Sequence, residues 1–101
     1  MSPSSESKTV SILVTVSKRG VTVEVITSDS ELAKYLMRHG FRSRTAFCLN
    51  PERLNRDIPC RYEKLFLHEF DARCFIKELE VRAAELGLET SLRIVKSMGS
   101  R

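Results

Sequence analysis

The sequence lacks the short motifs that identify most enzymes and metal sites. Its four glycines are isolated, so there is no glycine-rich loop of the kind that binds phosphate. Its three cysteines (Cys48, Cys60 and Cys74) form no CxxC pair, and their spacings of 12 and 14 residues match no zinc finger or ribbon. We therefore expect no metal site, no cofactor and no enzymatic activity. A Cys–His pair that meets only in the folded chain stays an alternative.

The chain also lacks a long hydrophobic run. Its first nine residues are polar, and the apolar stretch that follows is short and alternating, which fits neither a signal peptide nor a membrane span. An odd number of cysteines without a secretion signal predicts reduced thiols and a cytoplasmic location. Cys74 lies in a stretch with helical periodicity and is expected to be a small buried side chain.

What the chain does contain is an ordinary globular composition. Hydrophobic residues make up 42% and charged residues 30% of its 101 positions. We expect one intracellular α+β domain over residues 9–97, which is large enough to fold without disulfides or a structural metal. The polar ends, residues 1–8 and 98–101, are expected to be disordered.

The most regular stretch predicts a strand–helix–strand unit over residues 62–96. Apolar residues recur at three- and four-residue spacings through 71–86, which predicts an amphipathic helix. Asp71 is placed to cap its start, and Gly87 to end it. Residues 88–96 alternate like a half-buried strand.

The first strand of this unit is expected at 62–69. Residues 64–70 alternate with apolar side chains on both faces, which is typical of a central strand. A helix that runs back to Tyr62 is the competing interpretation, and Asp71 as a start signal favours the strand.

Alternating residues before this unit predict a hairpin of two strands, 10–16 and 20–27, with Gly20 in its turn. A capping-box spacing then predicts a helix at 28–39. A further strand is expected at 44–49.

Counted from the second strand, these elements give a βαββαβ order. The expected elements are strand 20–27, helix 28–39, strand 44–49, strand 62–69, helix 71–86 and strand 88–96. This is the order of a ferredoxin-like domain, with one extra N-terminal strand that forms a hairpin. A β-grasp-like fold is the alternative, because it also opens with a hairpin and a helix.

Positive charge is concentrated in residues 38–64. This segment holds seven cationic and three acidic residues, so its formal charge of +4 equals that of the whole chain. Most of the cations are arginines, whose planar guanidinium groups bind phosphates by two hydrogen bonds. The predicted phosphate contacts are Arg42, Arg44, Arg53, Arg56 and Arg61. Pairing of these arginines with local acids is the simpler alternative.

The strand at 64–70 adds a possible stacking surface. If Leu65 and Leu67 face the helices, the other side chains form a row on the open face of the sheet. That row is Lys64, Phe66, His68 and Phe70. Exposed aromatic side chains on a sheet can stack nucleic-acid bases. An apolar face of this kind is also typical of a protein interface.

We therefore expect a nucleic-acid-binding domain that uses the arginine-rich segment 38–61 and the open sheet face, with RNA or a single strand favoured over duplex DNA. The alternative is a protein–protein interaction adaptor or regulator, including a possible homodimer, that uses the same sheet face.

Overall fold

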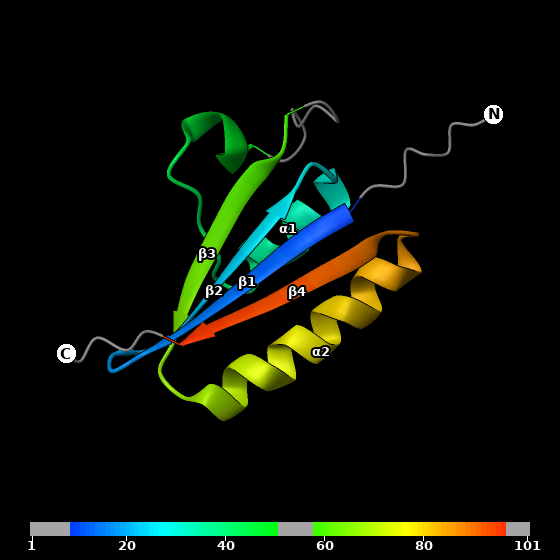
Figure 1. Ribbon diagram of the computed structural model, residues 1–101. Coiled ribbons are helices and arrows are strands. Elements are labelled where there is room, and N and C mark those ends of the chain that lie inside the picture. The colour runs from blue at the N-terminus through cyan, green and yellow to red at the C-terminus, as the bar shows by residue number, and fades with distance from the viewer. Residues whose placement is uncertain (1–8, 51–57, 97–101) are drawn as a thin grey trace.

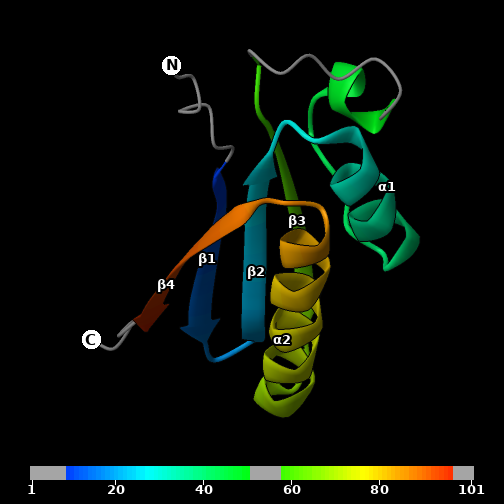
Figure 2. The same ribbon diagram turned by 90° about the vertical axis from the view of Figure 1, so that its right-hand side faces the viewer.

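The computed structural model describes residues 9–50 and 58–96. They form a four-stranded sheet with two α-helices on one face (Figures 1 and 2). The elements are β1 (Thr9–Ser17), β2 (Gly20–Thr27), α1 (Ser30–Arg38), the 3₁₀ helix η2 (Ala46–Leu49), β3 (Cys60–Phe66), α2 (Glu69–Glu85) and β4 (Glu89–Lys96). The predicted α+β class is confirmed.

The strands lie in the order β3-β2-β1-β4. β2 is antiparallel to both β1 and β3, whereas β4 is parallel to β1. β3 and β4 therefore run in the same direction at opposite edges of the sheet, and α2 connects them across the helical side (Figure 1). The predicted strand–helix–strand unit is present, with the β1–β2 hairpin inserted between its strands.

The β1–β2 hairpin is confirmed, and its alternating sequence explains the sheet's two faces. Val16 pairs with Val21, and Ser17 with Gly20, whose φ of 143° is in a region that favours glycine. Every second residue of the hairpin turns toward the helices and is buried. These residues are Val10, Ile12, Val14, Val21, Val23 and Val25. The other face of the hairpin carries mainly serine, threonine and half-buried apolar side chains.

An aromatic cluster joins the two helices to the end of β3. The Phe75 ring on α2 lies 5.1 Å from the Phe41 ring, 5.8 Å from Phe66 and 5.9 Å from Tyr35, between ring centroids. Such distances are typical of packed aromatic pairs. Phe66 is therefore part of the packing between the sheet and the helices.

The strand expected at 44–49 is wrong, because residues 46–49 form η2. Among the described residues of this connection, Arg42 alone pairs with a strand, through an isolated bridge to Glu63 of β3. Without that strand the ferredoxin-like order is not formed. The hairpin followed by a helix, which the β-grasp alternative also requires, is present.

The boundaries around residue 68 also differ from those expected. β3 ends at Phe66 and α2 begins at Glu69, so Asp71 lies in the first helical turn and does not cap it. A helix continuous from Tyr62 is equally wrong. β3 is an edge strand and not the central strand expected. Its outward-facing residues include the charged Arg61 and Glu63, whereas half of the apolar residues of 64–70 lie beyond its end at Phe66.

Two expectations about cysteine are wrong. Cys48 of η2 and Cys60 of β3 form a disulfide, and Cys74 on α2 is exposed. The cytoplasmic location inferred from reduced thiols loses that support. In the part of the chain that the structure describes, no helix is long and apolar enough to cross a membrane.

Candidate functional site

The side chains of β3 alternate in the opposite sense to the one expected. Cys60 and Tyr62 are almost fully buried against the helical side. By the two-residue period of a strand, Lys64 and Phe66 turn the same way. The prediction that Phe66 lies on the open face is therefore wrong, and its position in the aromatic cluster makes it unsuited to stacking a base.

His68 and Phe70 lie beyond the end of β3. His68 is the residue before α2, and Phe70 is in the first turn of that helix. Both are exposed, Phe70 by 74%. They do not continue a row on the sheet, because the chain leaves the sheet after Phe66.

A groove of about 550 Å³ crosses the outer edge of β3. Its lining residues come from the β1–β2 hairpin, the segment after α1, and β3: Ser17, Arg19, Thr22, Gly40, Arg42, Arg44, Glu63, Lys64 and Leu65. Four of these residues are cationic, and only Glu63 is acidic. The groove therefore has a formal charge of +3, which favours an anionic ligand.

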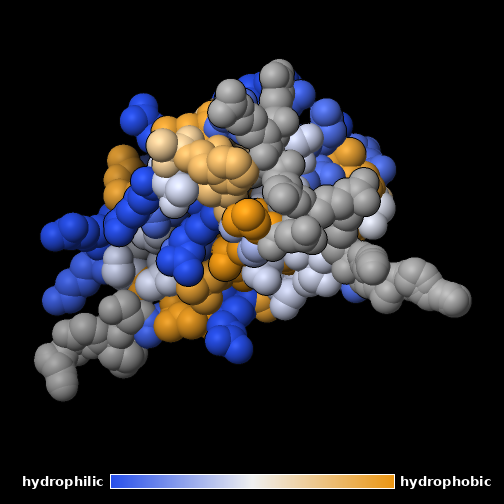
Figure 3. Space-filling model, turned by 90° about the horizontal axis from the view of Figure 1, so that it is seen from above, coloured by the Kyte–Doolittle hydropathy of each residue, from blue (hydrophilic) through white to orange (hydrophobic). Residues whose placement is uncertain are grey.

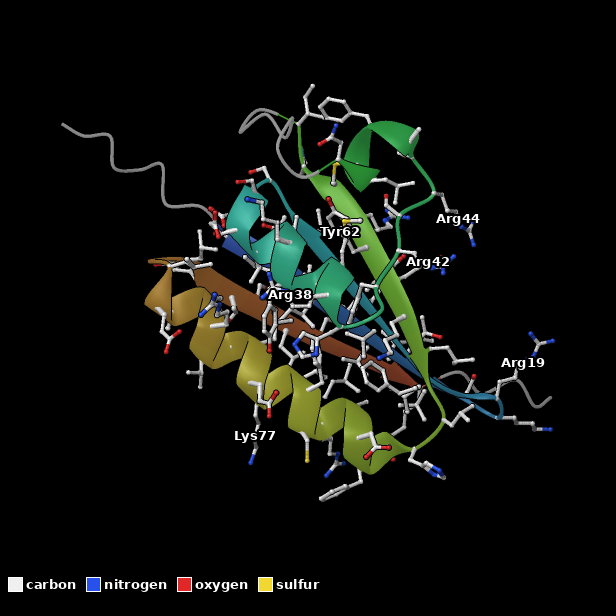
Figure 4. The ribbon with its side chains drawn as sticks, turned by 180° about the vertical axis from the view of Figure 1, so that it is seen from behind. Arg19, Arg38, Arg42, Arg44, Tyr62 and Lys77 are labelled. Carbon is white, nitrogen blue, oxygen red and sulfur yellow. A yellow bond between two sulfur atoms is a disulfide. The ribbon has the colours of Figure 1, made fainter. Side chains whose placement is uncertain are left out.

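Backbone hydrogen bonds hold Arg42 against this edge. The Arg42 N–H donates to the Glu63 carbonyl oxygen at 3.1 Å, and the Glu63 N–H donates to the Arg42 carbonyl oxygen at 2.9 Å. Figure 4 shows Arg42 and Arg44 projecting outward on the β3 side, with Arg19 farther along that side at the hairpin end. Arg38 on α1 and Lys77 on α2 lie away from them (Figure 4).

Arg44 is loosely held by its acidic neighbour. Its Nε lies 3.3 Å from a carboxylate oxygen of Glu63, yet its side chain is 90% exposed. A surface ion pair of this kind contributes at most about 1 kcal/mol. The guanidinium therefore keeps N–H groups that can donate to a phosphate.

Lys64 has a structural partner as well as a position in the groove. Its ammonium donates to the His39 carbonyl oxygen at 2.7 Å and lies 4.9 Å from the centroid of the Phe66 ring. His39 is the C-cap of α1, where a cation is favoured by the helix dipole. Lys64 therefore secures the helix end while adding positive charge to the groove.

A neighbouring cavity of about 390 Å³ has a balanced charge. It contains Arg44 and Arg61 together with Glu24 and Glu63. Arg61 is paired with Glu24 at 3.6 Å. The balanced cavity is the less suitable of the two for an anion, and the expected role of Arg61 is not supported by its position.

The structure thus brings together Arg42, Arg44 and Lys64 from the predicted set. Arg53 and Arg56 lie outside the described residues. Arg19 was missed, since its own neighbours indicate only a hairpin turn. Its place in the groove follows from the pairing of β2 with β3, which no local sequence pattern shows.

The end of the molecule near η2 carries exposed apolar side chains, Phe47, Leu49 and Ile58. Figure 3 views this end and shows hydrophobic surface beside hydrophilic side chains. Phe47 and Leu49 lie at the η2 end near the disulfide.

Over residues 9–50 and 58–96, no group of three or more His, Cys, Asp and Glu side chains could hold a metal ion.

Comparisons with protein-family models, with curated proteins and with solved structures found no match. The groove along β3 is therefore interpreted from its own residues and charges.

Proposed function

We propose that this protein binds the phosphate backbone of a single-stranded nucleic acid, such as RNA, in the groove along the outer edge of β3. The observation that carries the proposal is the excess of cations there, with Arg19, Arg42, Arg44 and Lys64 against Glu63. Arginine and lysine side chains neutralise phosphates and release condensed counterions, which drives binding without regard to base sequence.

A single strand suits this groove better than a duplex. Here the cations come from a turn, an extended segment and a strand edge, and they flank a groove that a flexible backbone can follow. Within the described residues the groove lining contains no aromatic side chain, so the proposal rests on phosphate contacts and not on base stacking.

The proposal is tested by fluorescence anisotropy with a labelled RNA of mixed sequence at low salt. The double variant Arg42→Gln/Arg44→Gln removes two groove cations and is expected to bind at least about tenfold more weakly. The matched control, Lys34→Gln/Lys77→Gln, removes two charges from the exposed surfaces of α1 and α2 and should bind like the wild type.

Competition separates a nucleic acid from an acidic protein as the ligand of the groove. If phosphates are the ligand, unlabelled single-stranded DNA should displace the RNA, and polyglutamate at equal charge should do so poorly. Displacement by polyglutamate alone, or failure of the wild type to bind RNA at low salt, would reject the proposal.

A further inference from the structure

β4 is an edge strand, and its outer side is unpaired within residues 9–50 and 58–96. Figure 2 shows it as the outermost strand on the side away from β3, with its carboxyl end diverging from α2. Both of its faces are exposed toward that end. Leu92 is 43% exposed, Ile94 60% and Val95 43%.

The two edges of the sheet differ in how well they are protected from pairing with another strand. The outer edge of β3 is bridged by Arg42, and Pro59, which lacks a backbone N–H, precedes it. β4 is eight residues long and contains neither proline nor glycine. Among the residues that the structure describes, no strand pairs with its outer side. A long edge strand with exposed apolar residues favours the addition of another strand.

We propose that β4 pairs in antiparallel fashion with β4 of a second copy of this chain, about a two-fold axis at Leu92. The two sheets then continue as one, with the helices of both copies on the same side. Residues directly opposite each other on antiparallel strands point to the same face. A continuous helical face therefore requires that the axis pass through a residue and not between two residues.

An axis at Leu92 places apolar residues of the two copies next to each other on the helical face. Register with β1 shows that Thr90, Leu92 and Ile94 share this face, because they stand beside the buried Val10, Ile12 and Val14. Leu92 then faces Leu92 of the second copy, and Thr90 faces Ile94. The partly exposed leucine and isoleucine would be covered.

The same axis brings opposite charges together on the open face. Arg93 stands opposite Ser91 of the second copy, and Glu89 of that copy is its diagonal neighbour, about 7–8 Å away between Cα atoms and within reach of a long side chain. Two such Glu89–Arg93 pairs form in the dimer, against one diagonal Arg93–Arg93 pair. An axis at Arg93 would instead place the two arginines directly opposite, which is unfavourable.

The expected dimer is reversible. A single strand–strand contact lies at the small end of specific interfaces, below about 1,200 Å² in total. We expect the dimer to have a dissociation constant of about 10–100 µM. The dimer leaves the β3 groove free at the far edge of each sheet, so its formation does not depend on the proposed nucleic-acid binding.

The first test is sedimentation of the full chain without reducing agent or nucleic acid, over concentrations up to about 1 mM. The exposed Cys74 thiol is alkylated beforehand in every sample, so that it cannot cross-link two copies. The wild type should shift from monomer to dimer. Leu92→Arg places two like charges at the axis and should weaken the dimer at least about tenfold. Leu65→Arg is the matched control, because Leu65 is 47% exposed on the opposite edge strand, and its dimer should match that of the wild type.

The second test examines the pairing of Glu89 with Arg93 of the second copy by exchanging charges. Glu89→Arg and Arg93→Glu each turn attraction into repulsion, and each alone should remain monomeric where the wild type dimerises. Mixing the two variants should restore the dimer, because every cross-strand charge pair is then attractive. The double variant Glu89→Arg/Arg93→Glu should behave like the wild type.

The outcomes separate the possibilities. A wild type that stays monomeric at the highest concentration would overturn pairing between copies. A dimer that Leu92→Arg leaves intact, or single variants that do not recover on mixing, would overturn pairing through β4. Loss of RNA binding by the groove variants changes none of these results.

Discussion

Tyr62 connects β3 to η2 through one buried hydrogen bond. Its hydroxyl donates to the Cys48 carbonyl oxygen at 2.7 Å, and the side chain is 0% exposed. Tyr62→Phe leaves a buried carbonyl without this donor and should lower the free energy of unfolding by about 1–2 kcal/mol. Urea denaturation at pH 7 measures this change in the free energy of unfolding. Tyr35→Phe is the control and should cost less, because Tyr35 is only partly buried against the core.

Alkaline pH provides a second measurement on the same tyrosine. Burial raises the pKa of the Tyr62 hydroxyl above its usual value of 10.0. Above pH 10 the unfolded chain loses this proton while the folded chain keeps it, so the stability contribution falls as pH rises through the folded pKa. The difference in unfolding free energy between wild type and Tyr62→Phe should therefore narrow above pH 10. A difference that widens would contradict the burial argument.

Two glycines with positive φ should respond differently to alanine. At Gly20 a Cβ would overlap the Phe66 carbonyl oxygen, whereas at Gly87 it would meet nothing within 4 Å. Gly87→Ala should cost only the left-handed backbone penalty, about 1–2 kcal/mol. Gly20→Ala should cost clearly more, because the hairpin must also move away from β3. Equal melting temperatures for the two variants would show that the hairpin and β3 are not in close contact.

At the scale of elements, the disulfide fastens η2 to the start of β3. Cys48 and Cys60 are 12 residues apart, and opening such a loop typically costs about 2–4 kcal/mol. Reductant should therefore lower the melting temperature of the wild type and of Cys74→Ser alike. Cys48→Ser/Cys60→Ser should start lower and not respond to reductant. Insensitivity of the wild type would show that this bond contributes nothing to stability.

The elements that the sequence predicted correctly are those with one strong local period. The hairpin alternates valines with polar residues, and α2 repeats its apolar residues at helical spacing, so each pattern admits one structure. β3 was found, but its two faces were exchanged, because Leu65 and Phe66 are both apolar and alternation alone does not say which is buried. The buried face is instead fixed by Tyr62 and Cys60, which contact residues outside the strand.

The connection between α1 and β3 was predicted wrongly for a related reason. Ala46 and Cys48 alternate with larger side chains as in a strand, but Cys48 is bonded to Cys60, and the backbone closes into η2. The basic groove was predicted in part. Arg42 and Arg44 were visible as charge in one segment, while Arg19 reaches the groove only through the pairing of β2 with β3.

At the scale of the whole molecule, the sheet separates two proposed activities. The β3 edge presents cations to a nucleic-acid strand, and the β4 edge presents apolar residues to a second copy. If both proposals hold, a dimer carries two basic grooves at opposite ends of one sheet. RNA that spans both should bind more tightly than a short one, and Leu92→Arg should abolish that difference while leaving the affinity for the short RNA unchanged.

The central claim is that groove arginines contact phosphates, and the salt dependence of binding to a short single-stranded RNA tests it most directly. Because Lys64 already donates to the His39 carbonyl oxygen, we count the contacts of Arg19, Arg42 and Arg44 alone. Three contacts predict that log K falls against log salt with a slope of about −2, since each single-strand contact contributes about −0.7. Arg42→Gln/Arg44→Gln should flatten the slope to about −0.7, and Lys34→Gln/Lys77→Gln should leave it unchanged. Equal slopes for the wild type and the groove variant would contradict the account.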